Sequence, residues 1–275
     1  MCRLVIEWSS KEHRVCSCLR QEIEMIPKKV NYIWLGGGKK SNFTNMCIVS
    51  WCEHLPDYEI IEWNESNLDL DKLCQGNRFL AECRKRKLWA FMADYLRLYV
   101  LYNYGGIYFD TDVQVLKSFD DLLDNHGFIG MEYFSKDTDG VVTEGTGVIA
   151  SEAGNPVIKE CLDYYSDRIW ETDVYYIPTI FSLVLQGKSR EDFRIYDVNY
   201  FAPYDYLKSF KKECIAKDTL AIHWFSASWH ENKNIGLFLK TKHIKNPVKK
   251  KLVQFINLLK YYKHKMGCVL RVLLN

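Results

Sequence analysis

The chain has 275 residues, with 37 Lys and Arg against 35 Asp and Glu, so its formal net charge is +2. This balance excludes a broadly basic nucleic-acid-binding protein and a strongly acidic tail protein. Hydrophobic residues make up 48% and charged residues 26%, which is typical of a globular protein. The charge is uneven, because residues 232–275 contain eleven Lys and Arg and no Asp or Glu. An acidic body is therefore followed by a cationic C-terminal segment.

The ten cysteines form no CxxC pair and no zinc-ligand array. Met1–Ser10 lacks the long apolar core of a secretory signal, so we expect reduced thiols and a cytoplasmic location. No run of 18 or more apolar residues occurs, and we expect no transmembrane helix.

Residues 1–24 are polar and irregular, and a well-patterned domain begins at Met25. The hydrophobic pattern predicts strands over residues 30–35, 58–63, 107–109, 127–132 and 145–150, strand-like segments near 193–198 and 219–225, and helices over 43–54, 79–103 and 156–170. Gly105 is predicted to end the long helix 79–103 in a left-handed conformation. The alternation of strands and helices predicts an α/β fold, with a mostly parallel sheet covered on both faces.

The most informative motif is Asp110-Thr111-Asp112, which directly follows the apolar strand Ile107-Tyr108-Phe109. Ligands of open α/β sheets bind at the carboxyl ends of strands. Two carboxylates at this position could hold Mg²⁺ or Mn²⁺ against a diphosphate, although a solvated turn is the alternative for a DxD sequence alone.

Further candidate residues lie elsewhere in the chain. Asp94 and Arg97 share one face of the long helix, where Arg97 could supply a bidentate fork and Asp94 could accept hydrogen bonds from hydroxyls; an intrahelical ion pair is the alternative. Trp34 ends the first strand and is either a base-stacking platform or a core residue. His223 follows an apolar strand and is either a metal ligand or structural.

Three segments together resemble glycosyltransferase family 32, the DXD-containing sugar transferases: residues 26–36 (IPKKVNYIWLG), 94–97 (DYLR) and 104–112 (YGGIYFDTD). That group includes capsular polysaccharide synthesis proteins and the yeast initiating mannosyltransferase, and the large clostridial glucosylating toxins are more distantly similar. The resemblance covers roughly residues 25–231. It implies a glycosyltransferase-A fold, a nucleotide-sugar donor, Mn²⁺ or Mg²⁺, and retention of anomeric configuration.

The resemblance also implies roles for individual residues. Trp34, with the neighbouring Leu35, would contact the nucleotide base, and Asn64 falls in a nucleotide-contacting segment. Asp94 and Arg97 would hold the donor hexose, and Tyr108 would lie against the nucleotide or sugar. Asp112 would ligate the metal ion, Asp110 would contact the ribose or the metal ion, and His223 would be a third metal ligand. Ser228 and Trp229 resemble the C-terminal loop that contacts the donor phosphate. Gly145-Thr146-Gly147 stands where the toxins carry an Asn, so no acceptor-side catalytic group is identified.

From these residues and the resemblance we expect a metal-dependent, retaining hexosyltransferase that uses a nucleotide-diphosphate sugar, with UDP-sugars favoured. Its acceptor would be a carbohydrate or a lipid-linked glycan in capsular or cell-surface polysaccharide biosynthesis, and we expect no nucleic-acid partner. Two alternatives are a haloacid-dehalogenase-type phosphohydrolase, because Asp110-Thr111-Asp112-Val113 fits a DxDx[TV] strand, and a non-enzymatic carbohydrate-binding protein.

We expect three parts: an accessory segment over 1–24, a catalytic domain over 25–231 and a basic amphipathic segment over 232–275. Residues 249–266 have the period of an amphipathic helix, with Leu252, Ile256, Leu259 and Met266 in one apolar row. This helix either packs on the domain or docks peripherally on the anionic inner face of the plasma membrane.

Overall fold

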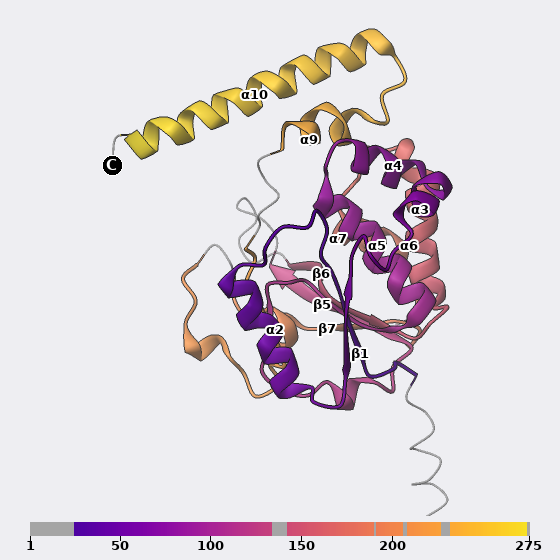
Figure 1. Cartoon of the computed structure of the whole chain (residues 1–275), viewed down its shortest axis with the longest axis vertical. Coiled ribbons are helices and arrows are strands. Elements are labelled where there is room, and N and C mark those ends of the chain that lie inside the picture. The colour runs from indigo at the N-terminus through magenta and orange to yellow at the C-terminus, as the bar shows by residue number, and fades with distance from the viewer. Residues whose placement is uncertain (1–24, 134–141, 190, 206–207, 227–231, 274–275) are drawn as a thin grey trace, which may run out of the picture.

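A six-stranded sheet with the order β2-β1-β3-β6-β5-β7 forms the centre of the fold (Figure 1). The computed structural model describes residues 25–133, 142–189, 191–205, 208–226 and 232–273. The strands are β1 (Lys29–Ile33), β2 (Glu59–Trp63), β3 (Gly106–Phe109), β5 (Gly127–Tyr133), β6 (Val142–Ser151) and β7 (Arg194–Tyr196). β6 runs antiparallel to its neighbours β3 and β5, while the pairs β1–β2, β1–β3 and β5–β7 are parallel. The predicted mostly parallel sheet is confirmed.

Alternate residues of the central strands serve two separate hydrophobic cores. In β3, Tyr108 faces one core while Ile107 and Phe109 face the other. The first core contains residues of α4 (Arg78–Lys85), α5 (Trp89–Tyr104), α6 (Pro156–Ser166) and α7 (Ile177–Leu185). The second contains residues of α2 (Asn42–His54) and α8 (Val198–Phe201). Helices therefore cover both faces of the sheet, as the buried strands required.

The predicted long helix over residues 79–103 is wrong as a single element. It consists of α4 and α5, which are separated by a turn in which Lys87 has a positive φ of 55°. The Leu88 N–H donates to the Cys83 carbonyl at 3.0 Å, which closes this turn. The apolar stripe continues across the break, so hydrophobic spacing did not reveal it. α3 (Leu70–Gly76) and α7 were not predicted at all.

Gly105 ends α5 with φ 64° and ψ −169°, so its predicted positive φ is confirmed, although its ψ lies outside the left-handed helical range. A Cβ atom at this position would approach the Ala153 nitrogen and the Pro27 Cδ to 3.0 Å. Glycine therefore allows the chain to turn sharply from α5 into β3, directly before the Asp110-Thr111-Asp112 motif.

A second, two-stranded sheet joins β4 (Val113–Val115) to β8 (Ala221–His223) in antiparallel orientation. Beyond it lie α9 (Lys233–Leu237), the 3-10 turn η4 (Leu239–Thr241) and the long α10 (Pro247–Leu273). Phe238 and Leu239 belong to the first hydrophobic core, so α9 and η4 are attached to the body. None of the helices in the described ranges has both the length and the apolar character needed to cross a membrane.

Candidate active site

The carboxyl end of β3 presents two aspartates. Backbone pairing with β6 extends to Asp110, whose N–H donates to the Gly147 carbonyl at 2.8 Å. The chain then turns, and the Val113 N–H donates to the Asp110 carbonyl at 3.0 Å at the start of β4. This tight turn holds Asp110 and Asp112 at the edge of the sheet where the parallel strands end.

The small β4–β8 sheet brings His223 to Asp112, although 111 residues separate them in sequence. Val113 is the partner of His223 in the ladder, and the Trp224 N–H donates to the Asp112 carbonyl at 3.0 Å. The His223 Nε2 atom lies 3.3 Å from Asp112 Oδ1. Ligand atoms of Asp110, Asp112 and His223 all lie within 4.8 Å of one another. Two carboxylates and an imidazole are a donor set that suits Mn²⁺ and also accepts Mg²⁺.

Glu132 on β5 fixes the orientation of the His223 ring. Its Oε1 atom lies 2.8 Å from His223 Nδ1, while the Nε2 atom faces Asp112. Burial by itself would lower the pKa of His223, but the carboxylates of Glu132 and Asp112 outweigh it and hold this pKa well above its usual value. A carboxylate behind a metal-binding histidine is a common arrangement, because it orients the ring and raises its basicity.

Two glycines of β6 leave the space that these side chains occupy. A Cβ atom on Gly147 would lie 2.6 Å from His223 Nδ1, and one on Gly145 would lie within 2.5 Å of the Glu132 side chain. The segment Gly145-Thr146-Gly147, which gave no acceptor-side group in the sequence, therefore accommodates the His223–Glu132 pair.

The segment after β8 holds Asp112 from the other side. The backbone N–H and the hydroxyl of Ser226 donate to Asp112 Oδ2 at 2.7 and 2.8 Å. Burial raises the pKa of Asp112, but His223 and these hydrogen bonds lower it well below its usual value, so the carboxylate is ionised. Phe225 has a positive φ of 51° and lies on the His223 ring at a centroid distance of 4.2 Å. A non-glycine residue with positive φ costs about 1–3 kcal/mol, and here it directs Ser226 toward Asp112.

Arg97 connects α5 to the aspartate motif. Its Nη2 atom lies 2.9 Å from Asp94 Oδ1 and 3.1 Å from Asp110 Oδ1, and Nη1 donates to the Thr146 carbonyl at 2.6 Å. Arg97 is only 5% exposed. Its buried guanidinium is paired by two carboxylates and a carbonyl. This arrangement orients Asp94 and Asp110; direct contact of Arg97 with a donor hexose stays a prediction.

Tyr108 and Asp94 complete this buried cluster. The Tyr108 hydroxyl donates to Asp110 Oδ1 at 2.8 Å, and the Arg97 guanidinium lies 4.5 Å from the centre of the tyrosine ring. Tyr108 is 2% exposed, so it supports Asp110 from within the core. Burial raises the pKa of Asp94 to about 7; Arg97 opposes this shift and Asp110 adds to it.

The remaining predicted residues follow the neighbouring parallel strands. Trp34 and Leu35 follow β1, and Asn64 follows β2, so all three lie at the same sheet edge as Asp110. The Trp34 indole donates to the Gly38 carbonyl at 2.7 Å, and Lys40 Nζ lies 5.3 Å from the centre of its ring. The Asn64 amide donates to Glu62 Oε1 at 3.0 Å. Ser228 and Trp229 fall outside the described residues.

Sequence reasoning missed Glu132, Ser226 and Thr146. Glu132 stands on a predicted strand with no distinctive neighbours, and Thr146 takes part through its carbonyl, so neither gave a signal. Ser226 gave a usable signal, because its hydroxyl lies between two candidate sites, three residues after His223 and two before Ser228.

Comparisons with known proteins indicate a class for this site. Residues 41–129 match the family model described as "Glycosyltransferase sugar-binding region containing DXD motif", which covers about a third of the chain and includes Asp94, Arg97, Asp110 and Asp112. With the acidic site at the end of β3, this match defines the class of the protein as a glycosyltransferase. No curated protein sequence matches the chain significantly.

Three similar solved structures are also glycosyltransferases by their titles. PaToxG glycosyltransferase is 18% identical, with 63% of this chain and 76% of that chain covered and a TM-score of 0.45. An enzyme involved in glycosylation of the PBCV-1 major capsid is 14% identical, with 75% and 97% covered and a TM-score of 0.45. Apo GlyE of Streptococcus pneumoniae TIGR4 is 12% identical, with 87% and 64% covered and a TM-score of 0.45.

Proposed function

We propose that the chain is a metal-dependent, retaining glycosyltransferase that moves a hexose from a nucleotide-diphosphate sugar, with UDP-sugars favoured, to a carbohydrate acceptor. The observation that carries the proposal is the cluster of Asp110, Asp112 and His223 at the carboxyl end of β3. The resemblance to glycosyltransferase family 32, and the more distant one to the clostridial toxins, supports retention of configuration. The same resemblance supports a role in capsular or cell-surface polysaccharide biosynthesis.

Asp110, Asp112 and His223 would hold Mn²⁺ or Mg²⁺. The bound cation supplies charge neutralisation of the departing diphosphate, usually the largest contribution in such reactions. The protein's own contribution is preorganisation: Glu132 and Ser226 hold His223 and Asp112 in place, and Arg97 and Tyr108 hold Asp110. Because these partners are already positioned, little reorganisation is needed when the donor binds.

Trp34, Leu35 and Asn64 occupy the same sheet edge and form the proposed nucleotide side of the site. Asp94 is the proposed acceptor of hydrogen bonds from the donor hexose, in keeping with its place beside Arg97 and its 14% exposed side chain. A phosphohydrolase of the haloacid-dehalogenase type would instead need Asp110 as its nucleophile. The guanidinium of Arg97 contacts both oxygens of Asp110, at 3.1 and 3.3 Å, which disfavours that reaction.

The test is a panel of nucleotide sugars incubated with the protein and Mn²⁺, with released nucleotide as the readout. We expect one donor to give clear turnover, and Asp112→Ala to abolish both transfer and slow donor hydrolysis. Asp121→Ala, an exposed aspartate of the 3-10 turn Asp120–Leu122, is the matched control and should keep full activity. Near-normal turnover by Asp112→Ala would refute the proposal, and glycan binding without nucleotide release would favour the carbohydrate-binding alternative.

A further inference from the structure

The long helix α10 has one face that lies against the protein. The half-buried residues of this face recur at spacings of three and four: Lys250, Val253, Gln254, Asn257, Leu258 and Tyr261. The Gln254 amide donates to the Leu237 carbonyl at 2.6 Å, and the Asn257 amide donates to the Gly236 carbonyl at 2.9 Å. α10 therefore lies on α9 and η4, held by hydrogen bonds from Gln254 and Asn257, with Val253, Leu258 and Tyr261 half-buried beside them.

The opposite face of α10 carries large apolar side chains that are exposed. Val248 is 75% exposed and Leu252 and Phe255 are each 58% exposed. The full row, at helical spacing, is Val248, Leu252, Phe255, Ile256, Leu259 and Tyr262. At 100° per residue these side chains fall within about 120° of arc, centred opposite Lys250 and Gln254. The amphipathic pattern of α10 is thus directed away from its own domain.

Lysines border this apolar face on both sides. On the helical wheel Lys251 lies beside one edge, Lys249 and Lys260 lie beside the other, and Lys263 lies just inside that second edge. The whole segment 232–275 contains eleven basic and no acidic residues. An apolar stripe flanked by lysines is the pattern of a helix that lies in the plane of a lipid interface, with its apolar side in the acyl boundary and its lysines at the headgroups.

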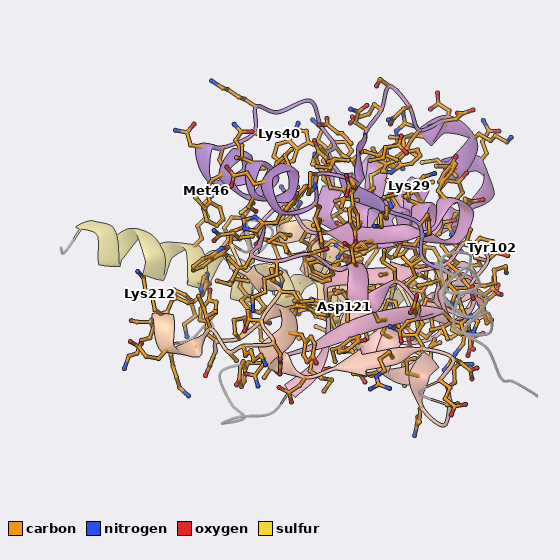
Figure 2. All side chains as sticks on the ribbon, turned by 90° about the horizontal axis from the view of Figure 1, so that it is seen from below. Lys29, Lys40, Met46, Tyr102, Asp121 and Lys212 are labelled. Carbon is orange, nitrogen blue, oxygen red and sulfur yellow. The ribbon has the colours of Figure 1, made fainter. Side chains whose placement is uncertain are left out.

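The segment that supports α10, from α9 to Lys242, is packed firmly against the catalytic body. Phe238 and Leu239 are buried in the first core, and the Arg86 guanidinium lies 4.3 Å from the centre of the Phe238 ring. Lys242 is buried and donates to the carbonyls of Thr172 and Val174 at 2.8 and 2.9 Å. Figure 1 shows α10 lying over α9 and reaching past the body, and the perpendicular view in Figure 2 also shows it projecting.

From this geometry we propose that α10 docks the enzyme on an anionic lipid surface, independently of sugar transfer. Charge complementarity identifies the occupant. A second copy packed helix to helix would bring lysines against lysines, whereas anionic headgroups would neutralise them. The remaining 231 residues contain 35 acidic and 26 basic residues, so the body itself would be repelled by such a surface. α10 is the element that overcomes this repulsion.

The test is sedimentation of the full chain with vesicles of phosphatidylcholine alone or of phosphatidylcholine with phosphatidylglycerol. We expect binding to the anionic vesicles only, weakening as salt rises. Lys260→Gln combined with Lys263→Gln should weaken binding by about 25-fold, at about fivefold per lysine. Lys211→Gln combined with Lys212→Gln changes the charge equally at exposed residues that do not belong to α10 and should bind like the wild type (Lys212 is labelled in Figure 2).

The apolar face has its own test. Leu252→Ser, Phe255→Ser and Leu259→Ser together should abolish vesicle binding, while the thermal melting temperature and donor hydrolysis stay unchanged because these side chains are exposed. Failure of the wild type to bind anionic vesicles, or equal binding by this triple variant, would overturn the proposal. A concentration-dependent dimer that the triple variant loses would assign the face to a second copy instead. Donor hydrolysis is measured separately, so either proposal can fail alone.

Discussion

Gly147→Ala should damage the candidate metal site without removing any of its ligands. The added Cβ atom would lie 2.6 Å from His223 Nδ1 and 2.7 Å from Cε1, whereas ordinary contact begins at 3.4 Å. His223 must therefore retreat by about 0.8 Å, or β6 must shift. The ring is held at both nitrogens, by Asp112 and Glu132, and β6 is paired on both edges with β3 and β5. Neither adjustment leaves the site intact.

The cost can be estimated from this overlap. Inserting a methyl group into a packed site costs about 1–3 kcal/mol. For a chain of this size each kcal/mol lowers the melting temperature by about 2–4 °C, so we expect a decrease of about 2–12 °C. Displacing the histidine from its carboxylate partner should weaken metal binding by about 10–100-fold.

Melting temperature and Mn²⁺ titration measure these two effects separately. Gly38→Ala is the matched control, because a Cβ atom there has nothing within 4 Å and its φ is not positive. The reasoning is refuted if Gly147→Ala melts within about 1 °C of the wild type and binds Mn²⁺ with the same affinity.

Three further outcomes follow from the same site. Glu132→Gln should fold normally but bind Mn²⁺ about 10-fold more weakly, as measured by titration, because His223 loses its charged partner; unchanged affinity would remove Glu132 from the site. Arg97→Met should lower the free energy of unfolding by about 3–5 kcal/mol in denaturant titration, because Asp94 and Asp110 lose a buried counter-charge. Arg97→Lys keeps only a point charge. It should retain part of this stability but less than a tenth of the transferase activity. Burial raises the pKa of Asp94 to about 7, so the ionised carboxylate accumulates as pH rises through 7. Donor affinity should therefore increase between about pH 6 and 8. Asp94→Asn should bind the donor weakly at every pH, and an unchanged pH profile in that variant would contradict this role.

The local elements were largely predictable from sequence. The apolar run of β3 followed by two carboxylates indicated a strand end with a polar site, and Gly105 indicated the sharp turn before it. Such features depend on residues a few positions apart, and side-chain periodicity and backbone sterics encode them directly. The break at Lys87 was not predictable in this way, because both α4 and α5 continue the same apolar stripe.

Tertiary structure decided how distant residues combine. His223 reaches Asp112 only because β4 pairs with β8, and Glu132 reaches His223 only because Gly145 and Gly147 leave room on β6. Strand pairing and close packing between remote segments leave no periodic trace in one sequence.

For the cationic C-terminal segment, too, the sequence determined some features and the tertiary structure determined others. Sequence alone determined that residues 232–275 are basic and that residues 249–266 form an amphipathic helix, because charge and helical period are local properties. It did not determine which face of the helix meets the domain. The structure assigns that contact to Gln254 and Asn257 and leaves the row containing Leu252 and Phe255 exposed, since only packed coordinates distinguish a buried apolar face from a free one.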